Sequence, residues 1–420
     1  MFYSFLKVLV RITLKIFFRK IFITGTEHIN GNKAQLIASN HPNGFLEPLI
    51  MACFFPKPLH FLVRGDVFDN PFLKPMLKST NQIPIFRFRD GFSRLRENSQ
   101  TIDESLQVLI EKSNLLIFAE GNTESIKKLR PLQKGISRIA FQTLEKQPDL
   151  DLEILPVGIN FTHPDQFDKT VMLRVGSPIK VSDYIGYYHE DKIHGNQYLL
   201  DSLFQEIKKN VIHIENQHRK FVFEQLAAVE RFMQQKPYLP VFLKTDFNLQ
   251  GEKKLANRID ALTDTEFESL SESMRTLENK IHAVNLKKDE IFKKPLGFID
   301  VLFLIFGFIP AMVGAIIHVI PITIGFWFTK TNVKQKEFKA SILMVSVLAL
   351  FLINYIILLV LSLIFNWPFY IIPTFIVCGL FLRLYYVVWN DVTFTPKAKI
   401  LLYRNEAIKI LSSLNEKEWL

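Results

Sequence analysis

The stretch QLIASNHPNGFLEP, residues 35–48, changes from strand character to helix character within a few residues. Its first five residues form a short apolar run of the kind found in buried strands. Pro42 and Gly44 then interrupt regular structure, because proline lacks a backbone N–H and glycine tolerates unusual backbone angles. A helix is expected to start near Phe45 or Leu46. The stretch therefore predicts a strand, a tight loop and a helix, which is the repeating unit of an α/β fold.

His41 and Glu47 stand on either side of this loop. On one continuous helix, side chains six residues apart point in nearly opposite directions, because each residue turns by about 100°. A loop between the two residues removes that constraint. A carboxylate that holds one imidazole nitrogen leaves the other nitrogen free to accept a proton. We therefore predict that His41 is a catalytic base and that Glu47 orients it.

The alternation of strand and helix continues on both sides of the stretch, from about residue 22 to residue 180. Short apolar runs predict seven strands, at residues 22–25, 35–39, 60–63, 83–87, 115–118, 153–158 and 171–176. Helices are expected at residues 46–54, 71–78, 93–112 and 135–146. This pattern predicts the α/β class, with a mixed sheet covered by helices.

Polar and basic residues follow several of the predicted strands. The segment IPIFRFR places Arg87 and Arg89 just after a strand, where α/β sheets bind ligands and where a guanidinium can hold a phosphate. The segment LLIFAEGNTES ends its strand in a sharp polar turn, and KKLRPLQKG adds cations for which a solvated charged face is the alternative interpretation. The predicted substrate-binding residues are Asn43, Arg87, Arg89, Glu120, Gly121, Thr123 and Lys134.

Four blocks occur in a fixed order: His-x5-Glu, Ile-Pro-x-x-Arg, Phe-x-Glu-Gly and Ile-x-Pro-x-Gly-x-Asn. Together they resemble the blocks of the glycerolipid acyltransferase family, and the similarity covers about residues 25–180. Glu47 departs from the usual His-x4-Asp spacing and is similar to the His-x5-Asp form of some eukaryotic glycerol-3-phosphate and dihydroxyacetone-phosphate acyltransferases. Ala119 replaces the usual proline of the third block, while its Glu-Gly core is intact.

The resemblance implies a membrane-bound acyltransferase of phospholipid biosynthesis. His41 would deprotonate the hydroxyl of 1-acyl-glycerol 3-phosphate, Glu47 would orient the imidazole, and Arg87 would bind the acceptor phosphate. The acyl donor would be a co-substrate, either acyl-CoA or acyl-carrier protein, and the family implies no cofactor and no metal. Two alternatives stay open: glycerol 3-phosphate or dihydroxyacetone phosphate as the acceptor, and an inactive lipid-binding scaffold.

The composition favours a membrane as the partner. Hydrophobic residues make up 48% of the 420 residues, phenylalanine occurs 39 times, and the net charge is +10. A basic chain binds either nucleic acid or an anionic membrane, and here basic and aromatic residues lie beside long apolar runs, which favours lipid. Cys53 and Cys378, the two cysteines, are far apart in apolar sequence, so a disulfide framework and a zinc site are excluded.

Within residues 1–22, cations recur at intervals of four residues from Lys7 to Arg19, and most of the remaining side chains are apolar. This spacing predicts an amphipathic helix that lies in the membrane interface, with an ordinary helix packed on its own domain as the alternative. The cations of this stripe are Lys7, Arg11, Lys15 and Arg19.

Residues 296–390 are predicted to form a transmembrane region. The stretches 340–365 and 367–389 each fit the ~20 apolar residues that one span needs. The stretch 297–328 is too long for one straight span, and lysines on both sides place both of its flanks in the cytoplasm. We therefore expect a re-entrant hairpin that bends near Pro310, and an integral membrane protein whose catalytic domain lies on the cytoplasmic face of the cell membrane.

The chain divides into five predicted parts. They are an interfacial helix at 1–22, an acyltransferase α/β domain at 23–190, a helical region of unknown role at 191–295, the transmembrane region at 296–390 and a cytoplasmic tail at 391–420. Asp300 and His318 lie in apolar sequence and make transport a minor alternative, since intramembrane ionisable groups are often functional. The predicted partners are membrane lipid, the acyl donor and a phosphorylated glycerol acceptor, without nucleic acid, and the oligomeric state is open.

Overall fold

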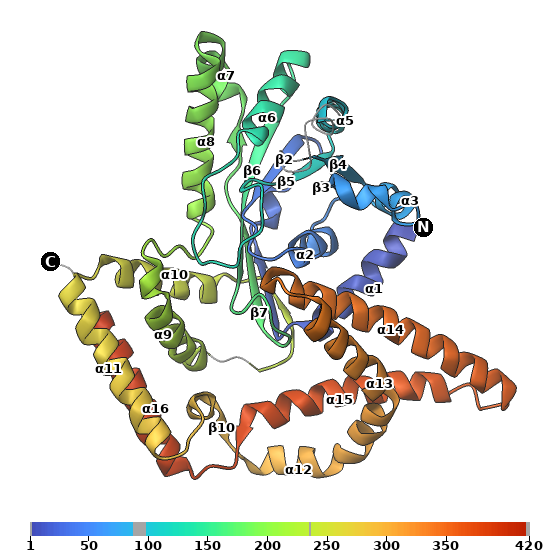
Figure 1. The fold of residues 1–420 in the computed structure, drawn as a ribbon, viewed down its shortest axis with the longest axis vertical. Helices are drawn as coiled ribbons and strands as arrows, with labels where there is room; N and C mark the ends of the chain where they lie inside the picture. The colour runs from blue at the N-terminus through green and yellow to red at the C-terminus, as the bar shows by residue number, and fades with distance from the viewer. Residues whose placement is uncertain (1, 87–97, 235–236, 417–420) are drawn as a thin grey trace. The chain divides into compact units, whose positions relative to one another are not determined.

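The computed structural model describes residues 2–86, 98–234 and 237–416 (Figure 1). The chain divides into two compact units. Unit 1 contains residues 1–213, 240–249 and 336–341, and unit 2 contains residues 214–239, 250–335 and 342–420.

A nine-stranded sheet forms the centre of unit 1. Its strands are β1 (Lys20–Thr24), β2 (Ala34–Ser39), β3 (Leu59–Arg64), β4 (Gln82–Ile85), β5 (Asn114–Phe118), β6 (Leu152–Phe161), β7 (Thr170–Val175), β8 (Ile179–Lys180) and β9 (Phe242–Leu243). Their order is β4-β3-β5-β2-β6-β7-β1-β9, and β8 pairs with β6. Strands β2 to β6 are parallel, whereas β7 is antiparallel to β6, so the sheet is mixed as predicted.

All seven predicted strands are present, because each was visible as an apolar run. Strands β8 and β9 were not predicted, since two residues are too short to show a pattern. Strand β9 reaches the sheet from far along the chain and pairs in parallel with β1.

Strands β2 and β6 lie at the centre of the sheet, and every residue in both is buried. Parallel strands covered on both faces are expected to be buried in this way. The covering helices are α2 (Leu46–Phe54), α3 (Leu73–Ser79), α5 (Asn98–Ile110), α6 (Gly135–Lys146), α7 (Ser182–Glu190) and α8 (Lys192–Lys208). Leu199, Leu203 and Ile207 of α8 belong to the same core as β2, which explains why unit 1 continues past residue 190.

Helix α1 (Phe2–Phe17) packs on α2 (Figure 1). Two cations of its basic stripe close the carboxyl end of α2: Lys7 Nζ donates to the carbonyl of Phe55 at 3.1 Å, and Arg11 Nε donates to that of Cys53 at 2.9 Å. Cations are favourable there because the last carbonyls of a helix lack partners and carry partial negative charge. The helix is confirmed, and its placement in a membrane interface stays a prediction.

Unit 2 consists of helices and one small strand pair. Its elements are α9 (Lys220–Met233), α10 (Phe247–Ala261), α11 (Asp264–Ala283), β10 (Lys294–Pro295), α12 (Phe298–Phe306), α13 (Phe308–Asn332), α14 (Lys336–Ile364), α15 (Ile371–Asp391), β11 (Val392–Thr393) and α16 (Lys397–Glu416). The first residues of α10 and of α14 belong to unit 1.

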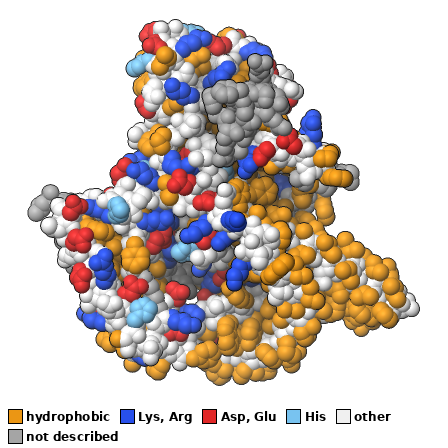
Figure 2. Space-filling view, in the orientation of Figure 1, with side chains coloured by type: hydrophobic (Ala, Val, Ile, Leu, Met, Phe, Trp, Pro, Cys, Tyr) orange, Lys and Arg blue, Asp and Glu red, His pale blue; other side chains and the backbone are white. Residues whose placement is uncertain are grey.

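In the part of the chain that the structure describes, three helices, α13, α14 and α15, are long and apolar enough to cross a membrane. Figure 2 shows hydrophobic side chains gathered over this part of the molecule. Gly307, three residues before Pro310, separates the nine-residue α12 from the 25-residue α13, and the re-entrant hairpin stays a prediction. Pro310 lies in the first turn of α13, where a missing backbone N–H costs no helical hydrogen bond.

Replacing Arg11 with Met should destabilise the protein, because the carbonyl of Cys53 then loses a charged donor. We expect the free energy of unfolding to fall by roughly 1–3 kcal/mol, the usual range for a hydrogen bond to a charged group. Lys15→Met is the matched control, since Lys15 lies on the same stripe but is exposed. Denaturant unfolding in detergent measures both, and equal stability of the two variants would contradict the capping role of Arg11.

Candidate active site

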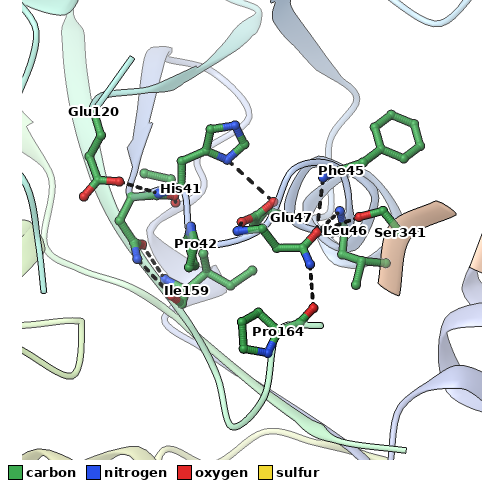
Figure 3. A network of polar contacts seen from close by, with 12 residues as sticks. His41, Pro42, Phe45, Leu46, Glu47, Glu120, Ile159, Pro164 and Ser341 are labelled. Carbon is green, nitrogen blue, oxygen red and sulfur yellow. Dashed lines mark hydrogen bonds and ion pairs between the residues drawn. The ribbon is translucent and has the colours of Figure 1, made fainter. Parts of the chain in front are cut away.

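The candidate site lies at the carboxyl ends of strands β2 and β5. These strands are parallel, and Ser39, the last residue of β2, is in register with Phe118, the last residue of β5. The two loops that follow therefore leave the same edge of the sheet. They bring His41 and Glu120 together, and the His41 backbone N–H donates to Oε2 of Glu120 at 2.9 Å (Figure 3).

The loop around His41 is anchored on its other side by Asn40. The Asn40 amide donates to the carbonyl of Ile159 at 3.0 Å and accepts from the Ile159 N–H at 2.8 Å. This side chain therefore continues the pairing of β2 with β6 for one more step. The sequence analysis did not select Asn40. Its position directly before His41 was a possible signal, and its partner Ile159 lies within the fourth block.

Glycine and asparagine in the fourth block serve packing. A Cβ at Gly158 would lie 2.1 Å from the carbonyl oxygen of Asn210, so no larger residue fits there. The side chain of Asn160 contacts the same segment after α8, because its Oδ1 accepts from the N–H of Ile212 at 2.7 Å. This block thus holds the segment after α8 against β6.

Glu47 is fully buried on the first turn of α2. Its Oε1 accepts a hydrogen bond from the N–H of Asn43, and its Oε2 lies 3.6 Å from Nδ1 of His41. Burial raises the pKa of the Glu47 carboxyl above its usual value, and the nearby imidazole and the Asn43 N–H partly offset this effect. The predicted loop between His41 and Glu47 is present, and it lets the two side chains face each other.

The His41 ring is nearly buried, with 13% of its side chain exposed. It stacks on Phe118 of β5, with ring centroids 3.9 Å apart and planes 11° from parallel. Among the described residues, neither His41 Nδ1 nor Glu47 Oε2 has another hydrogen-bond partner. A slight rotation brings the two atoms into hydrogen-bond range, and such contacts commonly tighten when substrate binds. Figure 3 shows the other ring nitrogen pointing away from Glu47.

Asn43 is buried and organises the start of α2. Its Oδ1 accepts from the N–H groups of Phe45 and Leu46, at 3.2 and 3.1 Å, and its Nδ2 donates to the carbonyl of Pro164 at 2.7 Å. Asparagine is a favoured helix cap for this reason. The structure therefore uses this amide internally, and a substrate contact through Asn43 stays a prediction.

Glu120 also has internal partners. Besides the His41 N–H, it accepts from the Arg130 backbone N–H at 2.8 Å and from Arg130 Nη2 at 2.7 Å. Arg130 thereby balances the charge of this carboxylate and fixes it beside the loop that carries His41. Gly121 follows with φ of 75°, in the left-handed region that glycine adopts without strain.

The remaining predicted site residues are spread around this centre. Thr123 is half-buried in the loop after β5, and Lys134 is exposed at the start of α6. Arg87 and Arg89 lie outside the described residues. Arg130, which the sequence interpretation did not select, is the cation that contacts Glu120.

The described residues contain no group of three or more His, Cys, Asp or Glu side chains placed to hold a metal ion. What the site does offer is an imidazole with one nitrogen against a buried carboxylate and the other directed away from it. Such a pair can accept a proton and then stabilise the resulting imidazolium.

The segment that carries this site resembles known proteins. Residues 20–160 match the family model described as Acyltransferase. Curated relatives include an uncharacterized acyltransferase of Schizosaccharomyces pombe, 29% identical over 97 residues, and glycerol-3-phosphate O-acyltransferase 1 of Saccharomyces cerevisiae, 29% identical over 96 residues. Each match covers 23% of this chain but only 14% and 12% of the respective relative, so the likeness concerns one segment.

A solved structure, the 1-acyl-sn-glycerophosphate acyltransferase of Thermotoga maritima, aligns with 45% of this chain and 71% of its own chain. At 15% identity and a TM-score of 0.33, this likeness is too low to support an argument.

The matched segment contains both His41 and Glu47, and it defines an acyltransferase domain. Residues 20–160 are therefore similar to the acyltransferase family, and this match and the curated relatives support the glycerolipid acyltransferase resemblance of the four blocks.

Replacing Glu47 with Gln tests the buried carboxylate through stability. Because the folded-state pKa of Glu47 is raised, this group stabilises the fold most below its unfolded pKa, near 4.5, and that contribution is lost as pH rises through the folded pKa. Glutamine carries no charge to bury. We therefore expect the melting temperature of Glu47→Gln, relative to the unsubstituted protein, to increase from pH 4 to pH 8. A difference that stays constant or decreases would contradict the raised pKa.

Proposed function

We propose that this protein transfers a fatty acyl group from an acyl thioester to a hydroxyl of a glycerol phosphate. The observation that carries the proposal is His41 Nδ1 facing the buried Glu47 carboxylate within the acyltransferase domain. The His-x5 spacing and the two Saccharomyces cerevisiae relatives, glycerol-3-phosphate O-acyltransferases 1 and 2, favour glycerol 3-phosphate as the acceptor. The acceptor expected from the four blocks, 1-acyl-glycerol 3-phosphate, is the second candidate.

In the proposed mechanism, the free nitrogen of His41 accepts the proton of the acceptor hydroxyl. The oxygen attacks the thioester carbonyl and forms a tetrahedral intermediate. When the carbon–sulfur bond breaks, the imidazolium returns the proton to the departing sulfur, so the products are an ester and a free thiol. Glu47 stabilises the imidazolium during these steps, and general base catalysis of this kind contributes roughly 10²- to 10⁴-fold.

The remaining substrate contacts follow from the family resemblance. Arg87 and Arg89 would hold the acceptor phosphate by charge-assisted hydrogen bonds. Thr123 and Lys134 flank the loops after β5 and before α6, on the segment that also carries Glu120. Acyl-CoA or acyl-carrier protein would supply the thioester, and the reaction as written uses no further cofactor.

Replacing His41 with Ala should abolish most ester formation. We expect the rate to fall by roughly 10²- to 10⁴-fold, because the general base is lost. The purified protein is assayed with acyl-CoA and, in parallel, with glycerol 3-phosphate and 1-acyl-glycerol 3-phosphate, and mass spectrometry identifies the product. His194→Ala, an exposed histidine in the same unit, is the control and should retain the full rate.

Full activity of His41→Ala would refute the mechanism. If ester forms only from 1-acyl-glycerol 3-phosphate, this lipid and not glycerol 3-phosphate is the acceptor. Lipid binding without turnover of either acceptor would favour the inactive scaffold.

We further propose that the acyltransferase domain faces the cytoplasm and that α12 and α13 form a re-entrant segment. Residues 336–341 belong to unit 1, so the loop after α13 lies on the same side of the membrane as the acyltransferase domain. Residues 214–296 connect unit 1 to α12, and their described part contains no helix long and apolar enough to cross. These observations support an arrangement in which both flanks of the α12–α13 stretch are on one side while α14 and α15 cross.

Labelling of introduced cysteines tests this arrangement. Lys334→Cys should react with a membrane-impermeant maleimide only from the side of the acyltransferase domain, and Phe369→Cys, in the turn between α14 and α15, only from the opposite side. Both positions are exposed. The native Cys53 and Cys378 are buried, and burial raises the pKa of the Cys53 thiol to about 11, so their background reaction is slow. Reaction of both introduced cysteines from the same side would overturn the proposal.

A further inference from the structure

The first turn of α14 is part of the candidate active site. Residues 336–341 belong to the same compact unit as His41 and Glu47, although almost 300 residues separate them along the chain. The rest of α14 is one of the three helices that could cross a membrane. The segment therefore lies far outside the acyltransferase match, which ends at residue 160.

Three contacts join this turn to the loop between His41 and Glu47. Ser341 Oγ donates to Oδ1 of Asn43 at 2.7 Å (Figure 3). The N–H of Gly44 donates to the carbonyl of Glu337 at 2.9 Å. The ring of Phe338 lies directly over Gly44, so that a Cβ on this glycine would be 2.2 Å from the ring.

The Ser341 hydrogen bond reaches the catalytic pair through Asn43. Oδ1 of Asn43 also accepts from the first N–H groups of α2, and the Asn43 backbone N–H donates to Glu47. Both Ser341 and Asn43 are buried, with 1% and 0% of their surfaces exposed. Because no water reaches these groups, a lost partner cannot be replaced by solvent.

We infer that Ser341 is a positioning residue of the acyltransferase site, acting through Asn43 on Glu47 and His41, with Phe338 and Glu337 fixing Gly44 beside it. This inference rests on the proposed function. According to this inference, the start of a candidate membrane-crossing helix supports the loop between His41 and Glu47. The acyltransferase domain is then complete only when α14 is in place.

The first test replaces Ser341 with Ala in the full-length protein. We expect kcat to fall about fivefold, the factor that corresponds to one ordinary buried hydrogen bond, with KM for acyl-CoA and for the acceptor nearly unchanged. Ser346→Ala is the matched control, because Ser346 lies on the same helix and donates only within it, to the carbonyl of Leu343. This control should keep the full kcat.

A double-mutant cycle separates positioning from a general loss of packing. If Ser341 acts through Asn43, Ser341→Ala should lower kcat no further in an Asn43→Ala background. Equal fold losses in both backgrounds, or a wild-type kcat for Ser341→Ala alone, would overturn the inference.

A second cycle does not depend on Asn43→Ala folding. Gly44→Ala should lower kcat by an order of magnitude or more, because the added methyl group meets the ring of Phe338. Phe338→Ala should restore a large part of that loss by opening the space. Gly44→Ala with full activity, or no recovery in the double variant, would count against the inference.

The outcomes distinguish this inference from the proposed function. If His41→Ala abolishes ester formation while Ser341→Ala and Gly44→Ala are fully active, the positioning role fails and the acyltransferase mechanism stands. If His41→Ala is fully active, the mechanism itself fails.

Discussion

The Glu47 carboxylate has no exposed surface, and the site is built around this fact. A buried carboxylate is costly unless nearby donors compensate for lost water. Here the Asn43 N–H donates to the carboxylate and the imidazole of His41 faces it at 3.6 Å, and both groups come from the loop that precedes α2. The loop must therefore hold one conformation, and much of the surrounding structure serves to fix it.

Strand direction explains how that conformation is fixed. Strands β5, β2 and β6 are neighbours and parallel, so their carboxyl ends meet at one edge. Glu120 after β5 and Ile159 in β6 can then hold the backbone and the Asn40 side chain on either side of His41. Several residues that look like substrate ligands in sequence thus have structural partners. Preorganised groups of this kind contribute to catalysis because no reorganisation is needed during the reaction.

The membrane region is joined to this arrangement by more than a linker. Helix α14 begins in unit 1, where Ser341 and Phe338 contact the loop between His41 and Glu47, and continues as an apolar helix. Helix α1 makes a second such contact at the opposite end of α2, through Lys7 and Arg11. The helix that carries Glu47 is therefore held at both ends by segments whose sequences suggest a membrane environment.

The sequence by itself determined the strand, loop and helix of residues 35–48, the α/β class and the apolar helices, because these depend on periodicity and on Pro and Gly at nearby positions. It also singled out His41 and Glu47, whose separation by a loop is a local property. Only the tertiary structure decided the partners of Glu120, the role of Asn40 and the contact of Ser341 with Asn43, and the roles of Arg87 and Arg89 stay predictions. Contacts between residues 119 or 298 positions apart depend on how the whole chain closes, and no local pattern of residue types records that closure.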